Sequence, residues 1–193
     1  WFRDLIVAQI PVEWEKQLGK MVLEGSINQS ETYQNKVVIE AIESIGHKLS
    51  KSIENSPYPF HFQVVINSQV NAFALPGGEM VVYTGLIQKA KTPEEVAGVM
   101  AHEIQHVLKR HGLKRIVGNV GLWTMVSLFL GDAGGLTALL TQAGTELLSL
   151  RFDREQESEA DLEGMKLMQN AGISPQGMVT FFQQLSTTED QLN

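Results

Sequence analysis

The 193-residue sequence contains no cysteine, and this absence removes three kinds of chemistry. Without thiols, the chain has neither a disulfide framework, nor a thiol nucleophile, nor a thiolate metal site. Positive charge is also scarce, because the net charge is −7 and the one basic run is "KRHGLKR" at 109–115. Nucleic-acid binding needs a broad basic surface, so we expect no nucleic-acid partner.

The chain also lacks an initiator methionine and a visible signal peptide. Its first residues, "WFRDLIVAQI", have neither a basic start nor a long apolar run. We therefore expect an excerpt of a longer protein, from which a targeting segment has been lost. With 193 residues and 43% apolar content, the sequence fits one globular domain, 1–193.

One region after the basic run is apolar and nearly uncharged. Residues 116–145 carry one charge, at Asp132, and the uncharged run 116–131 has 16 residues interrupted by glycine. A helix that spans a bilayer needs about 20 apolar residues. We therefore expect an apolar helical insertion over 116–150 that forms a lid or groove wall, in preference to a membrane span.

Hydrophobic periodicity predicts an α+β fold that is mainly α. Helical spacing over 11–24 and 31–55 gives a helical N-terminal part, 1–55. Strand-like alternation follows over 60–67, and a hairpin of 71–76 and 79–85, joined at Gly77-Gly78, completes a small sheet. The remaining expected segments are a helix over 92–112, the insertion 116–150, a helix over 154–170 and a C-terminal helix over 174–187.

The helix over 92–112 has clear capping residues. Thr92 is a good N-cap, Pro93 suits the first turn, and Glu95 completes a capping box. Gly112 is a natural C-cap. Next to it, His111 has the position of a cation at the negative end of the helix dipole, which requires no special role.

Within this helix the segment "VMAHEIQHVLKRHG" places ionisable groups on an apolar face. His102 and His106 are four residues apart and lie one above the other, so both imidazoles can reach one cation. Glu103 is turned about 100° away and can act on a water molecule. HExxH is a known metalloprotease motif. The alternative is a pair of structural histidines, and a third metal ligand decides between the two.

Elimination places that third ligand on a second helix. The residues after the motif do not continue the metzincin pattern, since Lys109 and Gly112 stand where glycine and histidine belong. The segment "RFDREQESEADLEGM" (151–165) then offers six acids. Helical phase puts Glu157 and Asp161 on a face with small residues, which suits a metal ligand and a carboxylate that holds a ligating histidine. The opposite face of this helix, which we expect to be solvated, carries Glu155, Glu159 and Glu163.

Four separated motifs resemble one known family. "NAFALPGGEMVVYTGL", "VMAHEIQHVLKRH", "REQESEAD" and "NAGISPQGMVTFFQQL" resemble the HtpX-like and CAAX-prenyl-protease-like zinc metallopeptidases, especially their soluble BepA-like envelope branch. The resemblance covers about residues 60–187 and implies a zincin-like domain with a small sheet before the HExxH helix. One departure is Asp153-Arg154, where the family usually has Ser-Arg.

The resemblance implies a role for each matching residue. His102, His106 and Glu157 would hold one Zn²⁺ per chain, Glu103 would be the general base, and Asp161 would be the second carboxylate or a proton donor. The implied protein is an endopeptidase of unfolded or damaged polypeptides in bacterial cell-envelope quality control. It would lie in the periplasm or cell envelope, and 116–145 is a candidate for contact with a membrane surface or an envelope protein.

Two rival interpretations stay open at this point. One is a chaperone-like or adaptor domain whose zinc is not catalytic, and the other is a latent enzyme with a blocked zinc position. A structural zinc site normally has four protein ligands, and the three found here favour catalysis. The sequence does not indicate an oligomeric state.

Two further features bear on substrate. Asn71 and Ala72 start the hairpin, which is either a plain structural hairpin or an edge that binds an extended peptide. Candidates for the group that stabilises the oxyanion are Tyr83, His111 and Arg154, which the sequence does not rank.

Overall fold

Three short strands form a mixed sheet in the computed structural model, which describes residues 2–27, 31–120 and 152–190. The strands are β1 (His61–Val65), β2 (Ala72–Ala74) and β3 (Glu79–Tyr83), in the order β1-β3-β2. β1 runs parallel to β3, and β2 runs antiparallel to it. The predicted hairpin is therefore confirmed, and β3, buried along most of its length, is the central strand.

The hairpin turn depends on Gly77, whose φ is 86°. A side chain here would be strained by this left-handed backbone and would also meet a neighbouring helix. A Cβ atom on Gly77 would lie 2.4 Å from the Cα of Lys16. Glycine therefore allows the turn and the close approach of the helix at the same point.

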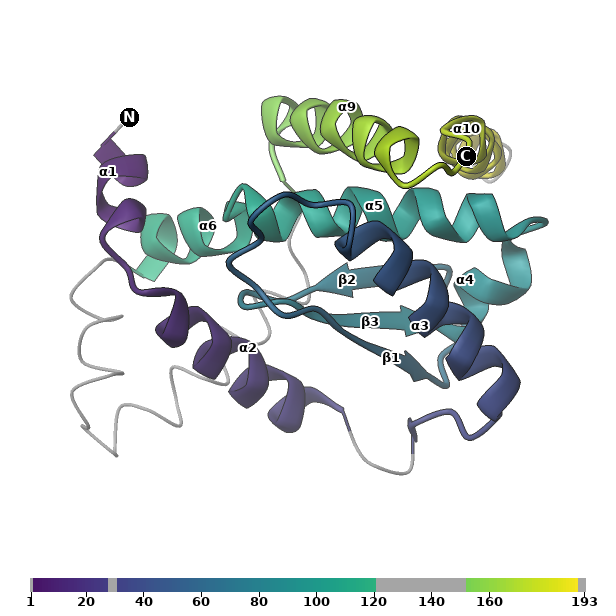
Figure 1. The fold of residues 1–193 in the computed structure, drawn as a ribbon, viewed down its shortest axis with the longest axis horizontal. Helices are drawn as coiled ribbons and strands as arrows, with labels where there is room; N and C mark the ends of the chain where they lie inside the picture. The colour runs from purple at the N-terminus through teal and green to yellow at the C-terminus, as the bar shows by residue number, and fades with distance from the viewer. Residues whose placement is uncertain (1, 28–30, 121–151, 191–193) are drawn as a thin grey trace.

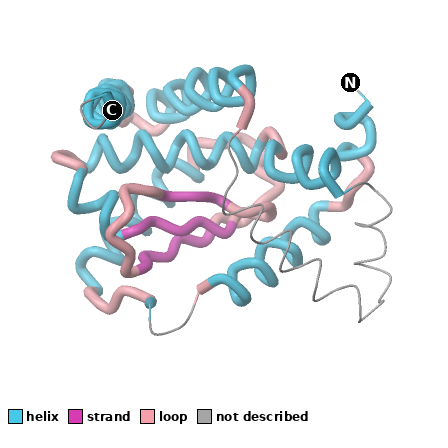
Figure 2. Tube along the Cα trace, turned by 180° about the vertical axis from the view of Figure 1, so that it is seen from behind, coloured by secondary structure: helices cyan, strands magenta, loops and turns pink. Residues whose placement is uncertain are grey.

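Helices lie on both faces of the sheet (Figures 1 and 2). Phe62, Met80 and Val82 pack into a core with α3 (Lys36–Ser50) and α5 (Pro93–Leu108). Phe73 and Val81 point the other way, into a core with α1 (Phe2–Ala8), α2 (Val12–Ser26) and α6 (His111–Val120). This alternation explains why neighbouring apolar residues of one strand are both buried.

The long helix α5 lies between β2 and a second pair of helices, α9 (Arg154–Asn170) and α10 (Gln176–Asp190) (Figure 1). The short helix α4 (Thr84–Lys89) connects β3 to the turn before α5. The fold is thus mainly α with a small sheet before the main helices, as the sequence predicted. The predicted helix over 154–170 coincides with α9, and the predicted C-terminal helix corresponds to α10.

Two predicted helices differ in their bounds. The helix predicted for 31–55 covers only Lys36–Ser50, because Asn35 accepts hydrogen bonds from the N–H groups of Val37 and Val38 and starts the helix there. The preceding residues pair with the edge of β1 instead, with Tyr33 N donating to Val64 O at 2.9 Å.

The helix predicted over 92–112 begins as expected and ends early. Thr92 Oγ1 accepts from Glu95 N, but the Glu95 carboxylate accepts from Lys91 N at 2.6 Å, one residue before the position that a capping box requires. The helix ends at Leu108, and Arg110 has a φ of 57°. Gly112 is therefore not the C-cap but lies inside α6.

Most of the predicted insertion over 116–150 lies outside the described residues. Only its first residues are described, as the end of α6. Among the described helices, none is both long and apolar enough to cross a membrane. The division of 1–193 as one domain stays a prediction.

Candidate metal centre

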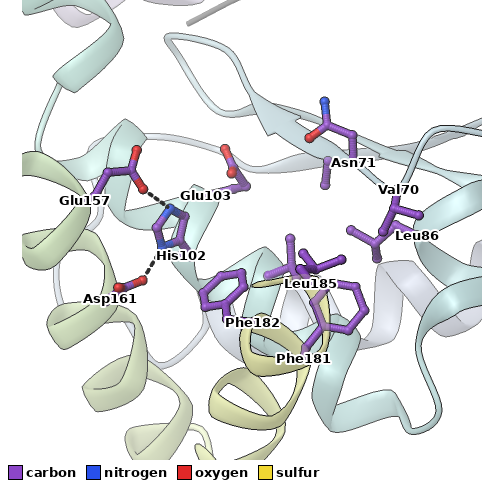
Figure 3. Close-up of a pocket in the computed structure, with 12 residues that line it drawn as sticks. Val70, Asn71, Leu86, His102, Glu103, Glu157, Asp161, Phe181, Phe182 and Leu185 are labelled. Atoms are coloured by element: carbon purple, nitrogen blue, oxygen red, sulfur yellow. Dashed lines mark hydrogen bonds and ion pairs between the residues drawn. The ribbon is translucent and has the colours of Figure 1, made fainter. Parts of the chain in front are cut away.

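Two helices bring three candidate ligands together. His102 and His106 project from α5, and their Nε2 atoms are 2.9 Å apart. Glu157 projects from α9, with Oε2 at 3.3 Å from His102 Nε2 and Oε1 at 3.9 Å from His106 Nε2. Figure 3 shows the carboxylate of Glu157 directed at the His102 ring. One ligand atom from each residue lies within 4.8 Å of the other two, which is the arrangement that a metal ion needs.

Small residues let α9 approach α5 closely at this point. Ala160 is fully buried, and a Cβ atom on Gly164 would lie only 3.2 Å from the backbone N of His102. Asp153 fixes the start of α9 through a capping box with Gln156. Because serine is also a good N-cap, Asp153 can serve in place of the serine that the related family usually has.

The second ring nitrogen of His102 is held by a carboxylate. Its Nδ1 lies 2.8 Å from Oδ1 of Asp161, one helical turn after Glu157. Burial lowers the pKa of His102, but the hydrogen bonds with Asp161 and Glu157, together with the charge of Glu103, raise it to about 10. Surroundings that favour a proton on this ring also favour a divalent cation, since both are positive charges.

The second ring nitrogen of His106 is held by another histidine. His106 Nδ1 lies 2.9 Å from Nδ1 of His111, and His111 Nε2 lies 3.1 Å from Oε2 of Glu159. His111 is buried in the first turn of α6, beyond the end of α5, and burial lowers its pKa, so the interpretation of it as a cation at the C-terminal end of the HExxH helix is wrong. Burial, followed by the charges of His102 and His111, lowers the pKa of His106 to about 2, which keeps the ring neutral.

Glu159 is half-exposed, in keeping with the solvated face that its helical phase predicted, but its carboxylate has two partners that the sequence did not indicate. Its Oε1 pairs with Lys109 Nζ at 2.7 Å, and its Oε2 pairs with His111. The hydrogen bond with Lys109 is the main cause of a lowered pKa for Glu159. By contrast, Glu155 is exposed as predicted.

Aromatic rings flank both candidate histidine ligands. Phe152 stacks on His106, with ring centroids 3.9 Å apart and an interplanar angle of 16°. Phe182 packs edge-on against His102, at 5.5 Å. These rings restrict rotation of the imidazoles and exclude water from their faces.

The donor set fits zinc. Two imidazole nitrogens and one carboxylate oxygen converge, which is a ligand set typical of catalytic zinc in proteins. Both Nε2 atoms are directed at the shared position, while both Nδ1 atoms are engaged elsewhere. Within the described residues, the geometry identifies His102, His106 and Glu157 as the group that could hold a metal ion.

Glu103 lies beside the ligands and faces the sheet. Its Oε2 accepts a hydrogen bond from Ala74 N in β2 at 3.2 Å. Desolvation in the cleft raises the pKa of Glu103 to about 7, and the charge of His102 and the N–H of Ala74 limit the rise. A carboxylate with a pKa near neutrality can both accept and release a proton.

A pocket of about 360 Å³ opens in front of Glu103 and His102 (Figure 3). Its wall is mainly apolar and comes from five parts of the fold: the β2 region, α4, α5, α9 and α10. Asn71 and Ala72 both line it, together with the candidate ligands His102 and Glu157. The apolar lining residues are Val70, Leu86, Val99, Phe181, Phe182 and Leu185.

Among the described strands, β2 is at an edge of the sheet, and its outer side is open at this pocket. Leu75 N donates to Glu79 O, and Tyr83 N donates to Asn71 O, so the odd-numbered residues of this segment bond to β3. In an antiparallel pair the residues between them direct their N–H and C=O groups outward. Ala72 and Ala74 therefore face away from β3, and Ala74 uses its N–H on Glu103.

None of the three oxyanion candidates is among the described residues that line this pocket. Tyr83 packs edge-on against Phe73, in the core on the other face of the sheet. His111 is buried between His106 and Glu159. Arg154 is exposed in the first turn of α9.

The sequence did not indicate the contact between His106 and His111. On a continuous helix, residues five apart stand about 140° from each other. The chain turn after Leu108 brings His111 back towards His106. The apolar pocket wall was also missed, because periodicity marks its side chains only as core.

Comparisons with known proteins agree with this geometry. The family model described as "Peptidase family M48" matches residues 38–189. The beta-barrel assembly-enhancing protease of Escherichia coli (strain K12) is 30% identical over 183 residues, covering 89% of this chain and 37% of that protein. Metalloprotease LoiP of the same organism is 32% identical, covering 81% of this chain and 62% of LoiP.

A plant also has a similar protein. Mitochondrial metalloendopeptidase OMA1 of Arabidopsis thaliana is 36% identical over 123 residues, covering 63% of this chain and 25% of that protein. This chain thus spans 37% of the length of the Escherichia coli assembly-enhancing protease and a smaller share of the plant protein.

Proposed function

This chain belongs to peptidase family M48 and is a metallopeptidase, as its motifs predicted, and from this premise we propose that it is a zinc-dependent endopeptidase of unfolded polypeptides in the bacterial cell envelope. Its substrates are polypeptides, as for any peptidase. One observation carries the proposal: His102, His106 and Glu157 converge beside Glu103, at a pocket with an open strand edge.

Zinc is the metal that the donor set supports best, with one ion per chain held by His102, His106 and Glu157. When bound, the ion supplies a Lewis acid that polarises the scissile carbonyl and makes a water molecule a better nucleophile. Three protein ligands leave a position open for chemistry, which favours a catalytic site over a structural one.

Glu103 is the proposed general base. Its carboxylate lies next to His102 without taking part in the ligand set, and Ala74 N holds one of its oxygens. Glu103 accepts a proton from the attacking water and then delivers it to the amine of the leaving peptide. Asp161 holds the His102 ring through Nδ1, which fixes the tautomer with Nε2 available as a ligand.

The open edge of β2 supports an extended substrate. A peptide that lies along Ala72 can pair with the outward N–H and C=O groups of this strand and so add a strand to the sheet. Folded proteins already use their backbone groups internally, so unfolded segments are the natural partners of such an edge. Asn71 and Ala72 are thus the proposed substrate-binding residues.

The apolar pocket supports the same substrate class. Leu86, Val99 and Phe181 form a wall that can bury one large apolar side chain beside the scissile bond. Such side chains are buried in native proteins and become available when a protein unfolds. We infer that the enzyme takes unfolded or damaged proteins, which is a quality-control activity.

The cell-envelope location rests on the relatives. The Escherichia coli protease at 30% identity is named for assembly of β-barrels, and we extend a periplasmic or envelope location to this chain by analogy. Contact with a membrane surface or an envelope protein through 116–145 stays a prediction.

Membership in a peptidase family favours an enzyme over the chaperone-like or adaptor domain that the sequence had left open. A direct experiment separates an active from a latent enzyme. The purified chain, loaded with one equivalent of Zn²⁺, is incubated with one substrate protein in its folded state and in a permanently unfolded state. The proposal predicts cleavage of the unfolded form, its loss on chelation and its return with Zn²⁺. Absence of cleavage by the zinc-loaded chain would contradict it.

A further inference from the structure

A hydrogen-bonded chain of three side chains leads away from the metal centre at His106. It runs from His106 Nδ1 to His111 Nδ1 at 2.9 Å, and from His111 Nε2 to Glu159 Oε2 at 3.1 Å. His106 and His111 are 3% and 1% exposed, so water does not replace these partners.

The position of each proton follows from the ligand geometry. A neutral imidazole that binds a metal through Nε2 carries its proton on Nδ1. His106 Nδ1 is therefore a donor, and the Nδ1 of His111 must accept from it. His111 then carries its own proton on Nε2, where it donates to the carboxylate of Glu159. Every ring nitrogen of the pair has a partner of the correct kind.

We propose that His111 and Glu159 are positioning residues that fix the tautomer and the orientation of the zinc ligand His106. They would perform for His106 the role that Asp161 performs for His102. This inference rests on the zinc site of the proposed function and adds two residues to it. Both act through His106 and do not touch the substrate or the metal.

The fold holds the pair in place from two sides. Lys109 binds Glu159 through Oε1, which leaves Oε2 directed at His111. Arg110 adopts a φ of 57° in the turn that brings His111 back towards His106. Its guanidinium donates to Val7 O and Ile10 O at 2.6 and 2.7 Å and so ties this turn to the N-terminal helices.

A merely structural buried histidine would not need this arrangement. Glu159 alone would satisfy one nitrogen of His111, and the other nitrogen could face any donor or acceptor of the core. Instead it faces the one nitrogen of His106 that is not directed at the metal position. The contact therefore belongs to the metal centre.

Zinc affinity tests the proposal independently of catalysis. We would measure the Zn²⁺ dissociation constant by competition with a chromophoric chelator, and the thermal unfolding of each metal-free protein as a control of folding. His111→Phe keeps a ring and removes the acceptor, so zinc binding should weaken by about 10–100-fold, as for other partners of ligating histidines. Glu159→Leu should weaken binding in the same direction.

Two further variants separate hydrogen bonding from packing. His111→Asn offers Oδ1 near the former Nδ1 and should recover most of the affinity that His111→Phe loses. Glu155→Leu, on the exposed part of the same helix, should bind zinc like the wild type.

The outcomes are distinguishable. Wild-type affinity in folded His111→Phe would overturn the proposal, as would equal losses in His111→Asn and His111→Phe. If His111→Phe fails to fold, Glu159→Leu decides, because wild-type affinity in that variant also overturns the proposal. Absence of zinc binding by the wild type would instead contradict the proposed function itself.

Discussion

The Nε2 atoms of His102 and His106 face each other at 2.9 Å, on successive turns of one helix. Asp161 engages the other nitrogen of His102, and His111 engages the other nitrogen of His106. These two contacts thus orient the Nε2 atoms of both rings towards one candidate metal position. Glu157 reaches the same position from a second helix. The following predictions start from this arrangement.

Removal of either imidazole should remove the metal. We expect about one zinc per wild-type chain, and loss of stoichiometric zinc in His102→Ala and in His106→Ala, because a catalytic site does not retain its ion with two protein ligands. Metal analysis after dialysis measures this directly. Full zinc content in both variants would exclude the site.

The acids of α9 should differ sharply in their effect on zinc. Glu157→Ala should abolish binding or weaken it severely, and Asp161→Ala should weaken it by about 10–100-fold through the orientation of His102. Glu155→Ala and Glu163→Ala are the matched controls and should bind normally. A larger loss in either control than in Glu157→Ala would mean that the helical phase is wrong.

The apolar pocket should set the preference for substrate side chains. In a peptide series that varies one residue beside the scissile bond, Leu and Phe should give kcat/KM values about tenfold or more above Ala, because an apolar pocket discriminates by buried area. Val99→Phe fills the pocket and should reverse this preference. Leu162→Phe is the control, since Leu162 is exposed and does not line the pocket. An unchanged preference in Val99→Phe would mean that the substrate side chain does not bind in this pocket.

The buried ion pair between Glu15 and Arg110 should matter for stability. Arg110 Nη2 lies 2.7 Å from Glu15 Oε1, and the Glu15 side chain is 1% exposed. Glu15→Ala leaves a charge without its partner and should lower the free energy of unfolding by about 3–5 kcal/mol. The exposed pair of Glu13 and Lys16 is the control, and Glu13→Ala should cost less than about 1 kcal/mol. Urea unfolding measures both, and equal small effects would contradict the buried-pair account.

The sequence predicted those features that depend on local periodicity. The spacing of His102 and His106 marked the two imidazoles, and the phase of α9 separated Glu157 and Asp161 from Glu155. The small residues Ala160 and Gly164 of α9 correctly indicated the face on which another helix, α5, approaches α9 closely. The paired glycines likewise marked the hairpin turn, because they tolerate the backbone that it needs.

The sequence did not predict the features that depend on distant contacts. Positive φ is usual for glycine and costly for other residues, so Gly112 was the expected end of the helix. Arg110 adopts that conformation instead, because its hydrogen bonds to Val7 and Ile10 and its pair with Glu15 stabilise it. These partners are about a hundred positions away in sequence, where no local pattern points to them. The contact of His111 with the metal centre follows from the same turn.

The most direct test of the central claim compares Glu103→Gln with the wild type at equal zinc content. The amide oxygen of glutamine can still accept from Ala74 N, so the fold and the three metal ligands should be unaffected. The account predicts normal zinc binding with hydrolysis of an unfolded substrate slowed by at least about 10²-fold, the usual loss when a general base is removed. An unchanged rate of hydrolysis by zinc-loaded Glu103→Gln would contradict the assignment of this site as the catalytic centre.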